Sequence, residues 1–131
     1  MAADFDVLVA AEQSSQPMLL FGAGRDMVVP PNESQNLAER VGERATFVWY
    51  PDLGHCMYIA ADQWTFEAAT WIYAVGEATN EGVTDAAELA SIGRLAIENS
   101  SYTRLTTADD DWDDDDIGEY ARLITPDDVG S

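Results

Sequence analysis

Two polar residues in this sequence stand where a proton relay could be built. Residues 17–26 form an apolar run that ends in a glycine-rich turn and Asp26, and residues 46–55 form a second apolar run that ends in a turn and His55. A carboxylate and an imidazole, each placed just after a buried strand, are two of the three members of a Ser-His-Asp relay. The carboxylate would fix the imidazole tautomer and stabilise the imidazolium formed during proton transfer. Asp26 and His55 are therefore the candidate catalytic residues.

Each of the two residues also has a simpler interpretation. Asp is a common turn residue, and a lone histidine is commonly structural. Their pairing at the ends of two apolar runs favours the relay, and that preference rests on motif context rather than on geometry.

The third member of the relay, a nucleophile, has no candidate here. A reactive serine on a strained strand-to-helix turn carries the pattern G-x-S-x-G, and the 131 residues contain no such pattern. Ser14 and Ser15 lie in a polar link without the flanking glycines. Cys56 follows His55 directly, but adjacent residues on an extended loop point in different directions, so we expect a small buried thiol.

The motifs predict no cofactor and no metal ion. Residues 22–26 lack both the lysine of a P-loop and the longer dinucleotide fingerprint. One histidine and one cysteine form no zinc cluster unless carboxylates supply the other ligands. The acidic run at residues 109–116, seven Asp around Trp112, lacks the glycine and the spaced glutamate of an EF-hand loop. We expect this run to be a solvated, disordered tail.

Charge is the unusual property of the composition. The chain has 25 acidic residues and 6 basic ones, all of them Arg, for a net charge of −19. Such a surface repels phosphate backbones and anionic headgroups, so we expect neither nucleic acid nor a membrane surface as partner. A high-salt cytoplasm and a GC-rich genome with one acidic tail are the two explanations. Residues 1–78 alone carry 11 acids against 3 Arg, which favours the first.

The remaining bulk features predict a cytoplasmic protein. A single cysteine forms no internal disulfide, in keeping with a reducing compartment. The N-terminus lacks the positive and apolar regions of a signal peptide. The longest apolar runs are too short to span a bilayer.

The elements that must position the two candidate residues alternate between strand and helix. Residues 3–12 predict the last turns of a helix, with a strand as the alternative, because Phe5, Val7, Val9 and Ala11 also alternate. Short links between successive elements imply parallel strands joined by a crossover. The predicted elements are strands at 18–21 and 45–50 and helices at 31–42 and 63–76, the second capped by Asp62. The inner stripe of the last helix is expected to include Trp64, Ala68, Trp71, Ile72 and Val75.

The character of the chain changes after Gly76. Residues 77–82 predict a linker, and Thr84 or Asp85 could cap a further helix that ends near Glu98. Residues 117–124 could form one short amphipathic turn. We therefore divide the chain into a main unit at residues 1–78, an additional helix at 79–98 and an acidic tail at 99–131.

Residues 17–76 contain three motifs in a fixed order. They are G-x-G-R-D-x-V-V-P-P after a strand, L-A-E-R in the next helix and P-D-L-G-H after the second strand. By these motifs the chain resembles the C-terminal portion of the α/β-hydrolase family. The resemblance implies an α/β class: a partial α/β-hydrolase fold of two parallel strands with a crossover and C-terminal helices. The family's N-terminal strands, oxyanion-hole loop and nucleophile turn would precede this region and are not expected in this chain. By the same likeness Asp26 corresponds to the acid of the relay and His55 to its base.

The resemblance also implies a function and its competitors. Intact relatives cleave ester, amide or similar bonds through an acyl-enzyme, and this chain alone is expected to be inactive. Its possible partners are a complementing N-terminal hydrolase segment, with a small-molecule substrate only on completion, or a second copy. The alternative is a non-catalytic interaction module that binds another chain through an open sheet edge. A third hypothesis is an acidic protein from a salt-loving organism whose motifs match by chance.

Overall fold

The computed structural model describes residues 6–100 and 122–124. The predicted acidic run at 109–116 lies outside this part of the chain, as does most of the predicted disordered tail. The described elements are, in order, α1 (Val7–Gln13), β1 (Met18–Ala23), α2 (Pro31–Val41), the 3-10 turn η1 (Gly42–Arg44), β2 (Ala45–Tyr50), the 3-10 segment η2 (His55–Ala60), α3 (Ala61–Asn80), α4 (Ala86–Asn99) and β3 (Arg122–Ile124).

The described strands form one sheet in the order β1-β2-β3. β1 and β2 are parallel, in a register that runs from Met18 opposite Ala45 to Ala23 opposite Tyr50. This confirms the predicted parallel pair with a helical connection. β3 pairs antiparallel with the other edge of β2. The predicted amphipathic turn over residues 117–124 is therefore wrong at 122–124, because so short a segment takes its conformation from the edge it pairs with.

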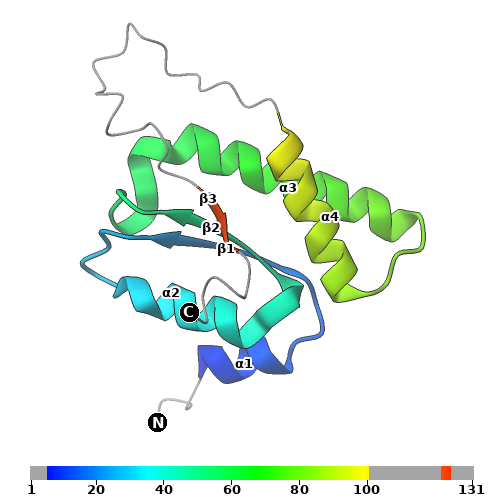
Figure 1. Cartoon of the computed structure of the whole chain (residues 1–131), viewed down its shortest axis with the longest axis horizontal. Coiled ribbons are helices and arrows are strands. Elements are labelled where there is room, and N and C mark those ends of the chain that lie inside the picture. Colours follow the sequence, from blue (N-terminus) through cyan, green and yellow to red (C-terminus); the bar gives the residue numbers. More distant parts are fainter. Residues whose placement is uncertain (1–5, 101–121, 125–131) are drawn as a thin grey trace, which may run out of the picture.

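The sheet is covered on both faces, as Figure 1 shows, with α1 and α2 on one side and α3 and α4 on the other. All six residues of β2 are buried. Phe47 and Trp49 pack with Ala38 of α2, whereas Val48 and Tyr50 pack with Trp71 of α3 and with α4. A strand buried on both faces has a continuous rather than an alternating apolar pattern, as this one does.

The first two helices begin and end where local chemistry favours it. The Asp6 carboxylate accepts from the backbone N–H groups of Leu8 and Val9, so α1 is a capped helix and the strand alternative is wrong. α2 begins with Pro31 and stops at Gly42, whose φ of 68° is a conformation that glycine adopts without strain.

Three details of α3 differ from the prediction. The helix continues directly from η2, so Ala60 is its N-cap and Asp62 lies in the first turn instead of capping it. α3 also runs on to Asn80, which makes the first part of the predicted linker at 77–82 helical. Ile72, expected on the inner stripe, is 64% exposed, because the buried positions are Glu67, Trp71 and Ala78, and Ile72 lies about 100° around the helix from Trp71.

α4, beyond the predicted main unit, shares a core with β2 and α3. Of the two predicted caps, Thr84 and Asp85, it is Asp85 that caps this helix: its carboxylate accepts from the Glu88 N–H at 2.9 Å. The Trp71 indole N–H donates to the Thr46 hydroxyl at 2.9 Å, and that hydroxyl donates to the Ala90 carbonyl at 2.8 Å. This buried chain of hydrogen bonds ties α3, β2 and α4 together. No helix in the described part of the chain is long and apolar enough to cross a bilayer.

Candidate functional site

Two loops meet at the carboxyl edge of the parallel strands. The acid loop, residues 24–30, follows β1, and the histidine loop, residues 51–60, follows β2. The Gly24 N–H donates to the Tyr50 carbonyl at 2.8 Å, and the Arg25 N–H donates to the Leu53 carbonyl at 2.9 Å. The carboxyl ends of parallel strands lie at the same edge of the sheet. These two hydrogen bonds continue the pairing of β1 with β2 beyond that edge and hold the acid loop against the histidine loop.

Gly24 is the point of closest approach between these loops. A Cβ atom at this position would lie 2.2 Å from the Pro51 carbonyl oxygen, well inside contact distance. Gly54, in the opposite loop, leaves more room, because its Cβ would lie 3.7 Å from the Arg25 carbonyl oxygen. The glycine of the acid loop is thus the one that the loop contact requires.

The two candidate residues come together at this edge. The Nδ1 atom of His55 lies 2.9 Å from Oδ2 of Asp26. The other carboxylate oxygen, Oδ1, accepts from the N–H groups of Val28 and Val29, both at 2.8 Å. The Asp26 side chain is 13% exposed and that of His55 is 42% exposed. The expected convergence of the two side chains is observed, while their catalytic role stays a prediction.

The hydrogen bonds decide the charge of Asp26. Its partial burial raises the pKa, but the bonds from His55, Val29 and Val28 outweigh burial, so the pKa of Asp26 is lowered below its ordinary value. The carboxyl group is therefore ionised at neutral pH and can only accept. His55 then donates through Nδ1, which leaves the lone pair of a neutral imidazole on Nε2. Chemically, the pair can take a proton at Nε2 from a group brought against it.

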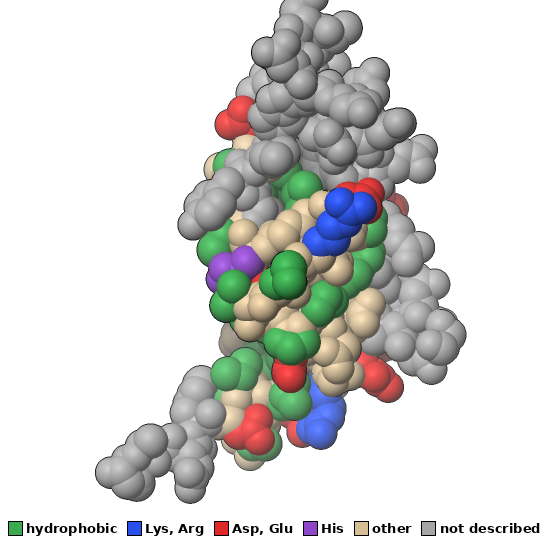
Figure 2. Space-filling model, turned by 90° about the vertical axis from the view of Figure 1, so that its left-hand side faces the viewer, with side chains coloured by type: hydrophobic (Ala, Val, Ile, Leu, Met, Phe, Trp, Pro, Cys, Tyr) green, Lys and Arg blue, Asp and Glu red, His purple; other side chains and the backbone are tan. Residues whose placement is uncertain are grey.

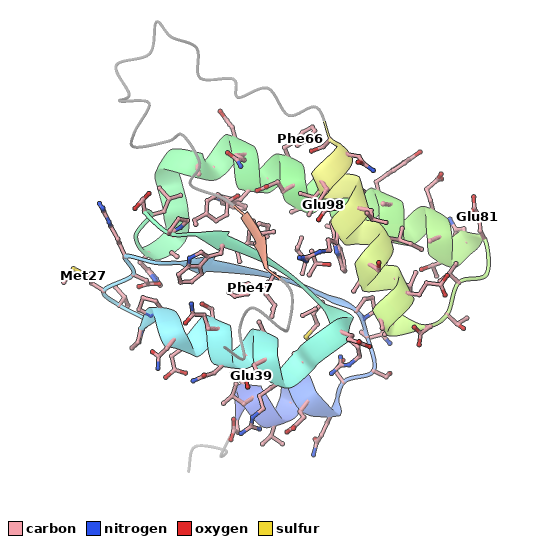
Figure 3. All side chains as sticks on the ribbon, in the orientation of Figure 1. Met27, Glu39, Phe47, Phe66, Glu81 and Glu98 are labelled. Carbon is pink, nitrogen blue, oxygen red and sulfur yellow. The ribbon has the colours of Figure 1, made fainter. Side chains whose placement is uncertain are left out.

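The site is open and has an apolar border. In Figure 2 the histidine side chain lies at the molecular surface, with hydrophobic side chains around it. Met27 is 96% exposed, and Figure 3 shows its side chain pointing away from the body of the molecule. Val28 and Val29 beside it are also exposed. The segment that Asp26 holds through its backbone thus presents apolar side chains outward.

Cys56 differs from the prediction. It is exposed rather than buried, and it has a φ of 67°, rare for a residue with a side chain. The expectation of a buried thiol is wrong because Cys56 is the second residue of the 3-10 segment η2, not part of an extended loop, and its side chain is exposed there. Across residues 6–100 and 122–124, no group of three or more His, Cys, Asp or Glu side chains could hold a metal ion.

Sequence reasoning missed two residues beside the site. Tyr50, the last residue of β2, is fully buried, and its hydroxyl donates to a carboxylate oxygen of Glu67 on α3. Glu67 is 7% exposed. One signal was available: Glu67 lies three residues after Trp64 and four before Trp71, so it shares the inner face of the helix with both. An acidic residue on an apolar face indicates a buried partner.

Comparison with known proteins agrees with this architecture. A family model described as TAP-like protein, one of the α/β-hydrolase families, matches residues 3–73. The matched region includes β1, α2, β2, both site loops and the first part of α3. No curated protein and no solved structure matches the chain.

Proposed function

The chain belongs to this α/β-hydrolase family of TAP-like proteins, and from that premise we propose that it supplies the acid and the base of a Ser-His-Asp relay. The observation that carries the proposal is the contact of 2.9 Å between His55 Nδ1 and Asp26 Oδ2, with the other carboxylate oxygen held by two backbone N–H groups. A turn residue without a catalytic role has no need of an imidazole partner. The proposed reaction is hydrolysis of an ester or amide bond through an acyl-enzyme.

The nucleophile must come from outside these 131 residues, because they contain no G-x-S-x-G turn. The partner we propose is an N-terminal hydrolase segment whose last strand adds in parallel to β1. Among the described residues β1 pairs with β2 alone, whereas both edges of β2 are occupied, by β1 and β3. A strand at the free edge of β1 would bring its following loop to the carboxyl edge where Asp26 and His55 lie.

Complementation tests this proposal. The chain is mixed or co-expressed with an N-terminal segment of a TAP-like hydrolase that carries G-x-S-x-G and ends before the strand equivalent to β1. We expect turnover of an aryl ester and labelling by a serine-reactive probe only when both pieces are present. Asp26→Asn in this chain should lower kcat by about 10⁴-fold, since the imidazole then loses its tautomer control.

The controls separate catalysis from folding. His55→Ala should abolish turnover, whereas Asp52→Asn, which breaks only the exposed contact of 3.5 Å with Arg25, should leave it nearly unchanged. Turnover by the isolated chain that is lost in His55→Ala would refute the requirement for an external nucleophile. A complex that forms but turns over equally with His55→Ala would refute the relay itself.

A second candidate function is a non-catalytic interaction module, and the free edge of β1 favours it as well. In that case the chain binds a partner through β1 without chemistry at His55. Size-exclusion chromatography with light scattering examines the simplest form, a second copy. If the chain is a compact monomer at low salt and forms no complex with the hydrolase segment, neither a second copy nor that segment is its partner.

A further inference from the structure

A buried polar pair connects the two ends of the histidine loop. Tyr50 ends β2 just before the loop, and Glu67 lies on α3 just after it. The Tyr50 hydroxyl donates to Oε1 of Glu67, across a loop of ten residues, 51–60. Both side chains are removed from water, with Tyr50 at 0% and Glu67 at 7% exposure. A hydrogen bond between two buried groups is costly to leave unmade, so it constrains the elements that carry them.

Tyr50 also contacts the loop itself. Leu53 and Ala60, near the two ends of the histidine loop, are buried in the same core cluster as Tyr50. The backbone carbonyl of Tyr50 accepts from Gly24 of the acid loop at 2.8 Å and from Leu53 at 3.4 Å. One residue thus joins the acid loop, the histidine loop and, through its hydroxyl, α3.

We propose that Tyr50 and Glu67 are positioning residues, which hold the histidine loop at the distance from the acid loop at which His55 and Asp26 meet. Neither is placed to touch a substrate, since both side chains are buried. Any effect of this role on catalysis rests on the proposed function. The role itself is to maintain the observed contact between His55 and Asp26.

The environment of Glu67 extends the pH range over which its carboxyl group stays protonated, compared with an exposed glutamate. Burial raises its pKa, and the hydrogen bonds from Tyr50 and Gln63 offset burial only in part. A Gln at this position keeps the acceptor oxygen for the Tyr50 hydroxyl, whereas a Leu removes it at similar volume. Comparing Glu67→Gln with Glu67→Leu therefore separates the effect of the hydrogen bond from the effect of the side-chain volume.

The test is NMR on the full chain, in which His55 is the only histidine and gives one set of ring resonances. The second probe is the amide protons of Val28 and Val29, which are bonded to Asp26. In Tyr50→Phe and Glu67→Leu we expect the His55 ring resonances to move and the two amides to exchange about tenfold faster. Glu67→Gln should restore both to nearly the wild-type values.

Val41→Ala is the control for a general loss of stability. Val41 is buried with Ala11 and Ala45 in a core cluster separate from that of Tyr50. The cavity that this substitution leaves should weaken the fold and leave the His55 resonances in place. Unchanged His55 and Val28 signals in Tyr50→Phe would overturn the proposal, and so would the same changes in Val41→Ala. Should Glu67→Leu not fold, Tyr50→Phe, which removes only the hydroxyl, decides the question.

This measurement needs no turnover, so its failure is distinct from failure of the complementation assay. If the relay is correct and the positioning role is wrong, the complemented complex is active while Tyr50→Phe leaves the NMR signals unchanged. If the reverse holds, the signals move and no His55-dependent turnover appears.

Discussion

At the scale of single residues, the site depends on Asp26, whose two carboxylate oxygens both accept hydrogen bonds. One oxygen meets the imidazole and the other holds the backbone of the next loop residues, so a single carboxylate organises both the relay pair and the exposed apolar segment beside it. Protonation or replacement of this carboxylate should therefore weaken its hydrogen bonds to the histidine and to the loop backbone at the same time.

The first prediction concerns acid. The pKa of Asp26 is lowered in the folded chain, so its stabilising contribution is present above the unfolded value of 3.8 and is lost as pH falls through the folded value. We expect the Val28 and Val29 amide shifts to titrate with a midpoint below 3.8, and Asp26→Ala to remove that titration. A midpoint clearly above 3.8 in wild-type protein would contradict this account.

The second prediction compares two glycines. Gly24→Ala must push the acid loop away from Pro51, and we expect a loss of about 1–3 kcal/mol in the free energy of unfolding. Gly54→Ala makes only an ordinary contact and should change it by less than about 0.5 kcal/mol. Urea unfolding of the two variants provides the measurement. Equal losses would show that the loops do not meet at Gly24.

At the scale of elements, the contact between α3 and α4 leads to the third prediction. Gly93→Ala drives a Cβ into the Trp71 ring and should destabilise by about 1–3 kcal/mol. Gly76→Ala, inside α3 with nothing within 4 Å of its Cβ, should stabilise by about 0.5–1 kcal/mol, because alanine loses less backbone entropy in a helix. Thermal unfolding will reveal the opposite signs, and a shared sign would refute the close packing of α4 on Trp71.

The fourth prediction concerns the buried carboxyl of α3. Because the pKa of Glu67 is raised on folding, its stabilising contribution is full below the unfolded value, about 4.5, and is lost as pH rises through the folded value. Glu67→Gln stays neutral, so its stability relative to wild type should increase as pH rises above 4.5. Glu77→Gln, exposed on the same helix, is the matched control because it removes the same charge. Melting temperatures from pH 4 to 8 that move in parallel for both variants would contradict the buried role of Glu67.

The elements also show which patterns are readable in a sequence. The helices and parallel strands were predictable, since apolar periodicity, Pro31, Gly42 and Asp85 act within a few residues of where they stand. The start of α3 was not, because η2 precedes it and supplies helical backbone before Asp62. Ile72 was misplaced because an apolar residue at the border of a helix stripe faces inward or outward according to what packs there.

At the scale of the whole molecule, charge is the dominant property. A net charge of −19 on 131 residues makes the folded chain repel itself at low ionic strength. The fifth prediction is a melting temperature that rises steadily between about 0.05 and 2 M KCl as the repulsion is screened. A flat response would remove the argument for a high-salt cytoplasm.

The same charge bears on assembly. A second copy at the edge of β1 that no described strand occupies would bring two strongly acidic chains together, so homodimers are expected to be favoured by salt.

The fold class, the parallel strand pair and the two residues that meet at the site could all be predicted from the amino-acid sequence. These follow from short-range patterns, and the geometry of parallel strands places any residue after them at one common edge. Tertiary contacts were needed to show that the partner of Glu67 is Tyr50, that Cys56 is exposed and that β3 pairs with the second edge of β2. Those outcomes depend on contacts between residues distant along the chain, and such contacts leave no periodic trace in a single sequence.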